Sequence, residues 1–227
     1  MEKLREPQAG AGGRLLSLSG IAAVALILLS FVVLGGDTPA SDDSAATINS
    51  FYDAHSGSSF AASFVLAAAA PFLVLFAVTL ALAFWPQDGR RSAWPYVLIA
   101  GGATAALGFM LAALIHFAVT DGADQDAVPG AALQALNTLD AGSWVAFNAG
   151  LGVLMLGAAG TLLASKASPV LAWIALAAGI ALFIPFADFA GLIVSGLWII
   201  ATSIVLFRRE GAANLGTSAD VASAPAA

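Results

Sequence analysis

Two polar residues inside apolar stretches have side chains that could do chemistry. His116 lies in the stretch GFMLAALIHFAVT, four residues before Thr120, and Asn148 lies five residues into a later apolar stretch. At 1.5 Å per helical residue, both lie roughly 6 to 8 Å from the same end of their helices. We therefore expect His116 and Asn148 to share a depth and, if their helices are neighbours, to form a hydrogen bond.

Other polar side chains are expected around this pair, at the outer mouth of a helical bundle. They are Asp140, Asp188, Tyr52, Asp53 and His55. Together with His116 and Asn148 they form the predicted binding cluster. Imidazole and carboxylate groups suit zinc, copper or nickel, but the spacing matches no recognised ligand pattern. We therefore assign no metal, no cofactor and no catalytic residue, and a purely structural role for His116 and Asn148 stays open.

Several kinds of chemistry are excluded by what the sequence lacks. It has no cysteine, which removes disulfides, thiolate metal sites and cysteine nucleophiles. It has no H-E-x-x-H pattern and no phosphate-binding glycine motif. The apolar stretches contain no Asp, Glu, Lys or Arg, which argues against proton transport through buried carboxylates and against a voltage sensor.

The elements that position the cluster follow from the composition. The chain has 227 residues, of which 60% are hydrophobic and 10% charged, and its mean hydropathy is +0.92. A bilayer-spanning helix needs roughly 17 to 25 apolar residues. Six stretches have about that length, at residues 15–34, 60–85, 96–119, 143–164, 169–186 and 189–207. The sequence therefore predicts an all-α membrane protein, a six-transmembrane-helix bundle.

The basic residues set the orientation of the bundle. They are Lys3, Arg5, Arg14, Arg90, Arg91, Lys166, Arg208 and Arg209. If six helices alternate, all eight fall on one face, which the positive-inside rule assigns to the cytoplasm together with both termini. The opposite face then holds Asp37, Asp42, Asp43, Asp53, Asp121, Asp124, Asp126, Asp140 and Asp188. The first span also fits a cleaved signal peptide, but its apolar core is longer than the 7 to 15 residues or so typical of one.

The segments outside the spans are of two kinds. Residues 1–13 and 209–227 are polar and lack aromatic side chains, so we expect two disordered cytoplasmic tails around a transmembrane domain at 14–208. The outer loops contain apolar residues at helical spacing, for example Ile48 and Tyr52 in one and Leu133 and Leu136 in the other. These loops are predicted to form short interfacial helices, with Asn137 and Asp140 among the residues facing water, which either cover a cavity as a lid or rest on the membrane surface.

A few residues within the hydrophobic pattern of the chain underlie a resemblance to other proteins. They are Phe51, Tyr52 and His55 in INSFYDAHSGSSF, Leu139 and Asp140 in LNTLDAGSWVAFN, and Gly196, Leu197 and Trp198 followed by Arg208 and Arg209 in FADFAGLIVSGLWIIATSIVLFRR. With its hydrophobic pattern over residues 12–210, the chain resembles a class of small bacterial six-span integral membrane proteins of unknown function. The resemblance implies a six-span fold and implies no activity.

Three functions are compatible with these observations, all in the bacterial cell (cytoplasmic) membrane, in contact with membrane lipids and without nucleic acid. The first is a non-enzymatic interaction or accessory protein with a membrane protein partner or a second copy of itself, which predicts a filled interior. The second is a carrier or receptor for an apolar or weakly polar small molecule or lipid, with a pocket of a few hundred Å³ near His116 and Asn148. The third is a metal-assisted membrane enzyme, which predicts His55 and His116 within ligand distance of each other.

Overall fold

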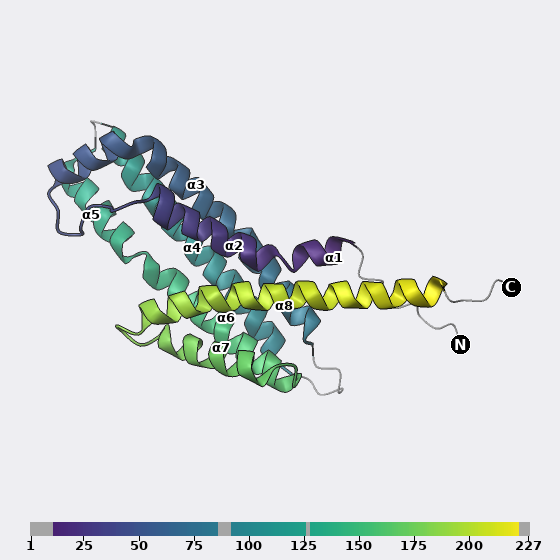
Figure 1. The fold of residues 1–227 in the computed structure, drawn as a ribbon. Coiled ribbons are helices and arrows are strands. Elements are labelled where there is room, and N and C mark those ends of the chain that lie inside the picture. Colours follow the sequence, from purple (N-terminus) through teal and green to yellow (C-terminus); the bar gives the residue numbers. More distant parts are fainter. Residues whose placement is uncertain (1–10, 86–91, 126–127, 223–227) are drawn as a thin grey trace.

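All the regular secondary structure is helical in the part of the chain that the computed structural model describes, residues 11–85, 92–125 and 128–222 (Figure 1). In chain order the helices are α1 (Ala11–Leu16), α2 (Ser19–Leu28), the π-helix η1 (Leu29–Leu34), α3 (Ala45–Ala83), α4 (Trp94–Asp124), α5 (Gly130–Gly142), α6 (Trp144–Ala164), α7 (Pro169–Ala181) and α8 (Asp188–Ala222). The predicted all-α class is therefore confirmed for these residues. Lys3, Arg5, Arg90, Arg91 and Asp126, on which the predicted orientation partly depends, lie outside them.

Four helical segments are long and apolar enough to cross a membrane. They are α3, α4, the continuous stretch Gly130–Ala164 that contains α5 and α6, and the part of α8 from Asp188 to Arg209. Two further apolar segments, Ser19–Leu34 and Pro169–Ala181, are shorter. They correspond to the predicted spans 15–34 and 169–186.

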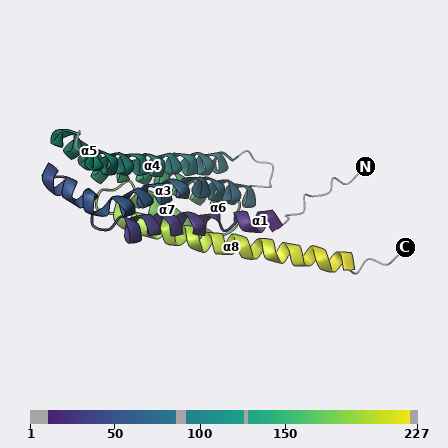
Figure 2. The same cartoon turned by 90° about the horizontal axis from the view of Figure 1, so that it is seen from above.

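The helices pack as a closed ring. Going round the ring, α2 contacts α3, α3 contacts α4, α4 contacts α6, α6 contacts α7, α7 contacts α8, and α8 returns to α2. Seen from above, the long helices run side by side, with α5 and the start of α3 at one end and α1 at the other (Figure 2). We call these the α5 end and the α1 end. The described chain begins at the α1 end and α8 also finishes there.

The helix boundaries differ from the prediction at several places, among them the end of α4, which lies at Asp124 and not at residue 119. The first predicted span is interrupted after α1 and begins again at Ser19. The predicted outer helix before the second span is continuous with that span in α3, and His55, with φ −122° and ψ 16°, is the non-helical residue at their junction. Where a disordered tail was predicted from residue 209, α8 continues to Ala222. Adding a residue to an existing helix requires no new nucleus, so a weakly helical sequence can extend one.

Glycines allow the closest helix contact in the bundle, between α4 and α6. A Cβ atom added at Gly150 would collide with the backbone of Ala105, and one added at Gly108 would collide with the backbone of Phe147. The same holds for Gly101 opposite Leu154 and Gly157 opposite Leu98. Small residues of this kind let helices in lipid approach until their backbones touch, which is where most of the attraction between apolar helices comes from.

We predict that Gly150→Ala weakens the bundle. The new methyl group has to push α6 away from α4, and overpacking of this kind typically lowers the free energy of unfolding by about 1–3 kcal/mol. Equilibrium unfolding of the purified protein in mixed micelles measures the loss.

The matched control is Gly57→Ala in α3, where an added Cβ meets no atom within 4 Å. Replacing a helical glycine by alanine where there is room is expected to stabilise by roughly 0.5–1 kcal/mol. Equal effects of the two substitutions would contradict the account of the α4–α6 contact.

Candidate functional site

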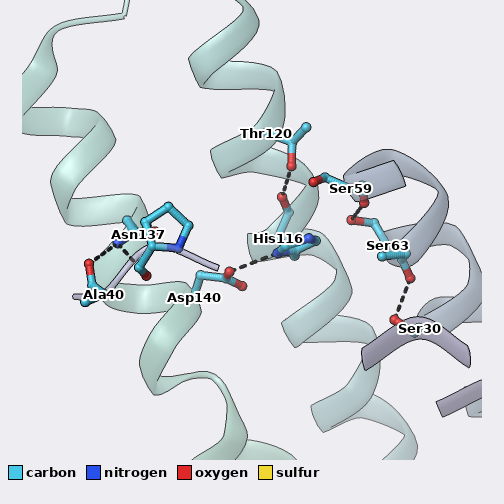
Figure 3. A network of polar contacts seen from close by, with 10 residues as sticks. Ser30, Ala40, Ser59, Ser63, His116, Thr120, Asn137 and Asp140 are labelled. Carbon is cyan, nitrogen blue, oxygen red and sulfur yellow. Dashed lines mark hydrogen bonds and ion pairs between the residues drawn. The ribbon is translucent and has the colours of Figure 1, made fainter. Parts of the chain in front are cut away.

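The main polar contact at the α5 end joins two consecutive helices, α4 and α5. His116 in α4 and Asp140 in α5 lie 2.9 Å apart, Nδ1 to Oδ2, and their side chains are 12% and 13% exposed (Figure 3). Asp140 accepts the hydrogen bond, so the Nδ1 atom of His116 carries the proton. The contact fixes both the ring of His116 and the position of α5 over the end of α4.

Tyr52 of α3 completes a group of three with this pair. Its side chain is fully buried, and its ring meets that of His116 edge to face at a centroid distance of 5.9 Å. The Tyr52 hydroxyl is buried beside the carboxylate of Asp140, which acts on it electrostatically. The Nε2 atom of His116 is buried without a hydrogen-bond partner among the described residues. Buried polar atoms of this kind are uncommon because each costs about 1–3 kcal/mol of desolvation.

Helix α5 is held over the bundle by polar and apolar contacts. Asn137 is buried and donates a hydrogen bond of 2.8 Å to the backbone carbonyl of Ala40. On the apolar side, Leu133 packs with Ile48 and Val119. The expectation that Asn137 and Asp140 face water is wrong, because the carbonyl of Ala40 and the ring of His116 take up their polar atoms.

A polar cavity of about 230 Å³ lies beside the His116–Asp140 pair. The polar residues of its lining are these two and Ser30, Thr38, Ser63 and Ser143. Ser30 of η1 donates a hydrogen bond of 2.9 Å to the carbonyl of Ala62 in α3. Ser59 and Ser63 of α3 lie on the side of the His116 ring that faces away from Asp140 (Figure 3). The cavity is therefore lined by η1 and the residues that follow it, by α3 and α4, and by the junction of α5 with α6.

A larger apolar groove adjoins the polar cavity. It has a volume of about 470 Å³ and extends between η1 and the first half of α8. Its lining includes Val32, Leu151, Ile193 and Gly196, and nearly all of it is hydrocarbon. Phe31 and Phe147 line both spaces, so the cavity and the groove adjoin at these two rings.

Asn148 and Asp188 lie elsewhere, so the predicted contact between Asn148 and His116 is wrong. These two residues line a separate cavity of about 230 Å³ with Phe183. The helices α4 and α6 meet with Gly108 opposite Phe147. His116 is eight residues beyond Gly108, a rise of about 12 Å, so Asn148 lies deeper along the bundle than His116. The Oδ1 atom of Asn148 has no hydrogen-bond partner among the described residues.

His55 and Asp53 are on the exposed surface of α3. The His55 ring stacks on Phe51 at a centroid distance of 4.5 Å, and its Nδ1 atom lies 2.8 Å from the carbonyl oxygen of Phe51. Within the described ranges, no group of three or more His, Cys, Asp or Glu side chains is placed to hold a metal ion. The structure thus brings together His116, Asp140 and Tyr52 from the predicted cluster of seven.

Sequence reasoning missed the rest of the site. Ser30 and Ser63 were visible as hydroxyls within otherwise apolar stretches. Phe31 and Phe147 carry no such signal, because an aromatic residue in a membrane helix usually packs against lipid or another helix. Only the geometry of η1 and α6 places these two rings between the two parts of the site.

The fold and the site together define an all-helical protein, in its described part, with four apolar helical segments of membrane-spanning length, a polar cavity toward the α5 end and an apolar groove beside it. Comparisons of the chain with protein-family models, with curated proteins and with solved structures find no match.

We predict that Asp140→Ala destabilises the α5 end. The substitution leaves the Nδ1–H group of His116 without an acceptor, which should lower the free energy of unfolding by about 1–3 kcal/mol. Asp140→Asn keeps an acceptor oxygen and should lose less. Equilibrium unfolding in mixed micelles measures both values.

Asp53→Ala is the control, because it removes an exposed aspartate from the same end of the bundle. Exposed substitutions of this kind usually change stability by less than about 0.5 kcal/mol. If Asp140→Ala cost no more than Asp53→Ala, the contact with His116 would not hold α5 in place.

Proposed function

We propose that the protein is a multi-pass protein of the bacterial cytoplasmic membrane that binds an amphipathic molecule taken from the outer leaflet. A single observation carries the proposal. The polar cavity at His116 and the apolar groove at η1 and α8 adjoin each other, and Phe31 and Phe147 line both. Ligand sites of proteins are typically apolar spaces with a few fixed polar groups. Here the polar groups lie in the cavity and the apolar side chains in the adjoining groove, which matches the headgroup and the chain of a lipid.

The proposed topology has six membrane crossings. The α6–α7 turn lies at the α1 end and the α7–α8 turn at the opposite end (Figure 1). Helix α7 therefore runs from one end of the bundle to the other, between α6 and α8, which belong to segments long enough to span a membrane. The stretch Ser19–Leu34 likewise returns the chain from the α1 end to the start of α3. A short apolar helix can cross with modest adjustment of the bilayer or of its flanking residues.

The proposed orientation has the α5 end outside. The described basic residues are Arg14 in α1, Lys166 in the α6–α7 turn, and Arg208 and Arg209 in α8. These segments lie toward the α1 end, and the guanidinium of Arg209 lies 4.8 Å from the ring centroid of Phe84, at the end of α3. Basic residues near the ends of membrane helices stay in the cytoplasm, which favours an α1 end inside and a ligand site in the outer half of the bilayer.

The groove gives the site its route to the lipid. It lies between η1 and α8, and several of its lining side chains, including Val32, Ile193 and Leu197, are exposed at the surface of the bundle. A hydrocarbon chain could therefore slide in sideways from the bilayer without crossing the ring of helices. The headgroup would then rest beside His116 and Asp140.

A second candidate function, an accessory protein that contacts a partner, is favoured by a different observation. Helix α8 continues beyond the rest of the bundle at the α1 end (Figures 1 and 2). In the proposed orientation this extension would lie in the cytoplasm, within reach of a membrane protein partner or a second copy of the chain. The two functions are compatible, since a bound amphiphile could regulate such a contact.

We predict that Gly196→Leu prevents occupation of the groove. Gly196 lines the groove, and the nearest atom to an added Cβ is Val24 Cγ1 at 3.9 Å, so the larger side chain fills the space without striking backbone. After purification in mild detergent, mass spectrometry of the bound lipid fraction should find an amphiphile with the wild type. With the variant, the amount should be lower by roughly tenfold at least.

The matched control is Ala201→Leu, an exposed position of the same helix that does not line the groove. It should retain as much bound amphiphile as the wild type. Equal amounts of amphiphile on the wild type and on Gly196→Leu, or none on either, would overturn the proposed function.

A further inference from the structure

We propose that the headgroup bound in the polar cavity is a cation, so that the ligand is a lipophilic ammonium compound and not a phospholipid. This inference rests on the amphiphile site proposed above and adds the charge of the headgroup. It depends on the ionisable groups that line the cavity, on the aromatic rings beside them and on the charges of the whole α5 end.

The charges that line the polar cavity are the first observation. Asp140 and His116 are the ionisable side chains among its described lining residues, and no Lys or Arg lines it. A phosphate headgroup would therefore meet a carboxylate with no arginine or lysine to bind it, although these are the residues that normally recognise phosphate. An ammonium group would meet the same carboxylate as a counter-ion.

The geometry of His116 leaves the charge of Asp140 in place. The ring donates from Nδ1 to Asp140, and its Nε2 atom is buried without a partner among the described residues. A second proton on Nε2 would create a buried, charged donor with no acceptor, which is costly. Of the other elements around the ring, α3 contributes Tyr52, whose hydroxyl is neutral in its ordinary protonated state. An imidazole that donates from Nδ1 alone adds no charge of its own, so the pair then carries the negative charge of the carboxylate.

Aromatic rings are the second observation. Phe31, Trp144 and Phe147 line the polar cavity together with Asp140. The face of an aromatic ring attracts a cation within about 6 Å, and recognition of ammonium groups by several rings is a recurrent use of this interaction. An uncharged alcohol would gain little from the rings, and an anion would be repelled by their faces.

The charge of the surrounding surface points the same way. The described ionisable side chains of the segments at the α5 end are acidic apart from His55 and His116: Asp37, Asp42, Asp43, Asp53, Asp121, Asp124, Asp140 and Asp188. The Lys and Arg residues of the sequence are all outside these segments. A surface of one sign attracts ligands of the opposite sign and repels those of the same sign, so cations should accumulate at the mouth of the cavity.

The test compares three ligands with the same hydrocarbon chain: decylammonium, decanol and decyl sulfate. The dependence of the melting temperature on ligand concentration, for the full chain in a non-ionic detergent, gives an apparent Kd for each. For the wild type we expect decylammonium to bind at least roughly tenfold more tightly than decanol. Decyl sulfate should bind most weakly of the three.

Three variants assign this preference to the cavity. Asp140→Asn removes the charge and keeps an acceptor for His116, so it should reduce the preference for decylammonium over decanol to within about twofold. Phe31→Leu should lower the preference by roughly two- to fivefold. Asp188→Asn makes the same change of charge at the same end of the bundle but in the separate cavity lined by Asn148, and it should leave the preference nearly unchanged.

The outcomes separate the two proposals. If none of the three compounds shifts the melting temperature of the wild type, the amphiphile site itself fails. If decanol or decyl sulfate binds the wild type as tightly as decylammonium, the site stands and the cationic headgroup is wrong; this comparison needs no variant. If Asp188→Asn removes the preference as fully as Asp140→Asn, the selectivity comes from the general surface charge and the assignment to Asp140 is overturned.

Discussion

The high free energy of a charge or an unpaired polar group in hydrocarbon is the constraint on which the rest of this structure depends. It requires the apolar segments to be helices, because a helix satisfies its backbone hydrogen bonds internally. It keeps the Lys and Arg residues of the sequence out of the apolar stretches. It also means that a polar side chain within the bilayer needs a hydrogen-bonding or charged partner, so its position indicates a candidate site. At the α5 end, Asp140 is that partner for one nitrogen of His116, and the other nitrogen has none among the described residues.

Tight packing on one side of the ring and looser packing on the other create the site. The helices α4 and α6 approach until Gly108 lies against the backbone of Phe147, which leaves no room for a ligand between them. The π-helix η1, in which the amide of Gly35 reaches back to the carbonyl of Ser30, faces α8 across the apolar groove. Insertions of this kind into helices are frequent at functional sites. Here the π-helix places Ser30 and Phe31 in the wall of the polar cavity.

Local signals in the sequence predicted the helices well and the site only in part. Length and hydropathy identify α3, α4, α6 and α8, because spanning a bilayer needs a fixed number of apolar residues. Membership of His116 and Asp140 in one cluster followed from their place near helix ends. The partner of His116 could not be predicted in this way. Its depth was counted from an expected helix end near residue 119, whereas α4 continues to Asp124. The adjoining groove could not be predicted either, since it arises from the spacing of η1 and α8 and from no single residue.

The central claim is that the polar cavity belongs to the outer half of the membrane, and cysteine labelling tests it most directly. The natural sequence has no cysteine, so Ser41→Cys, before α3 at the α5 end, and Ala167→Cys, in the α6–α7 turn, each introduce one exposed thiol. In spheroplasts, a membrane-impermeant maleimide should label Ser41→Cys at once and Ala167→Cys only after the membrane is permeabilised. Immediate labelling of Ala167→Cys, with Ser41→Cys protected until permeabilisation, would place the cavity on the cytoplasmic side and contradict the account.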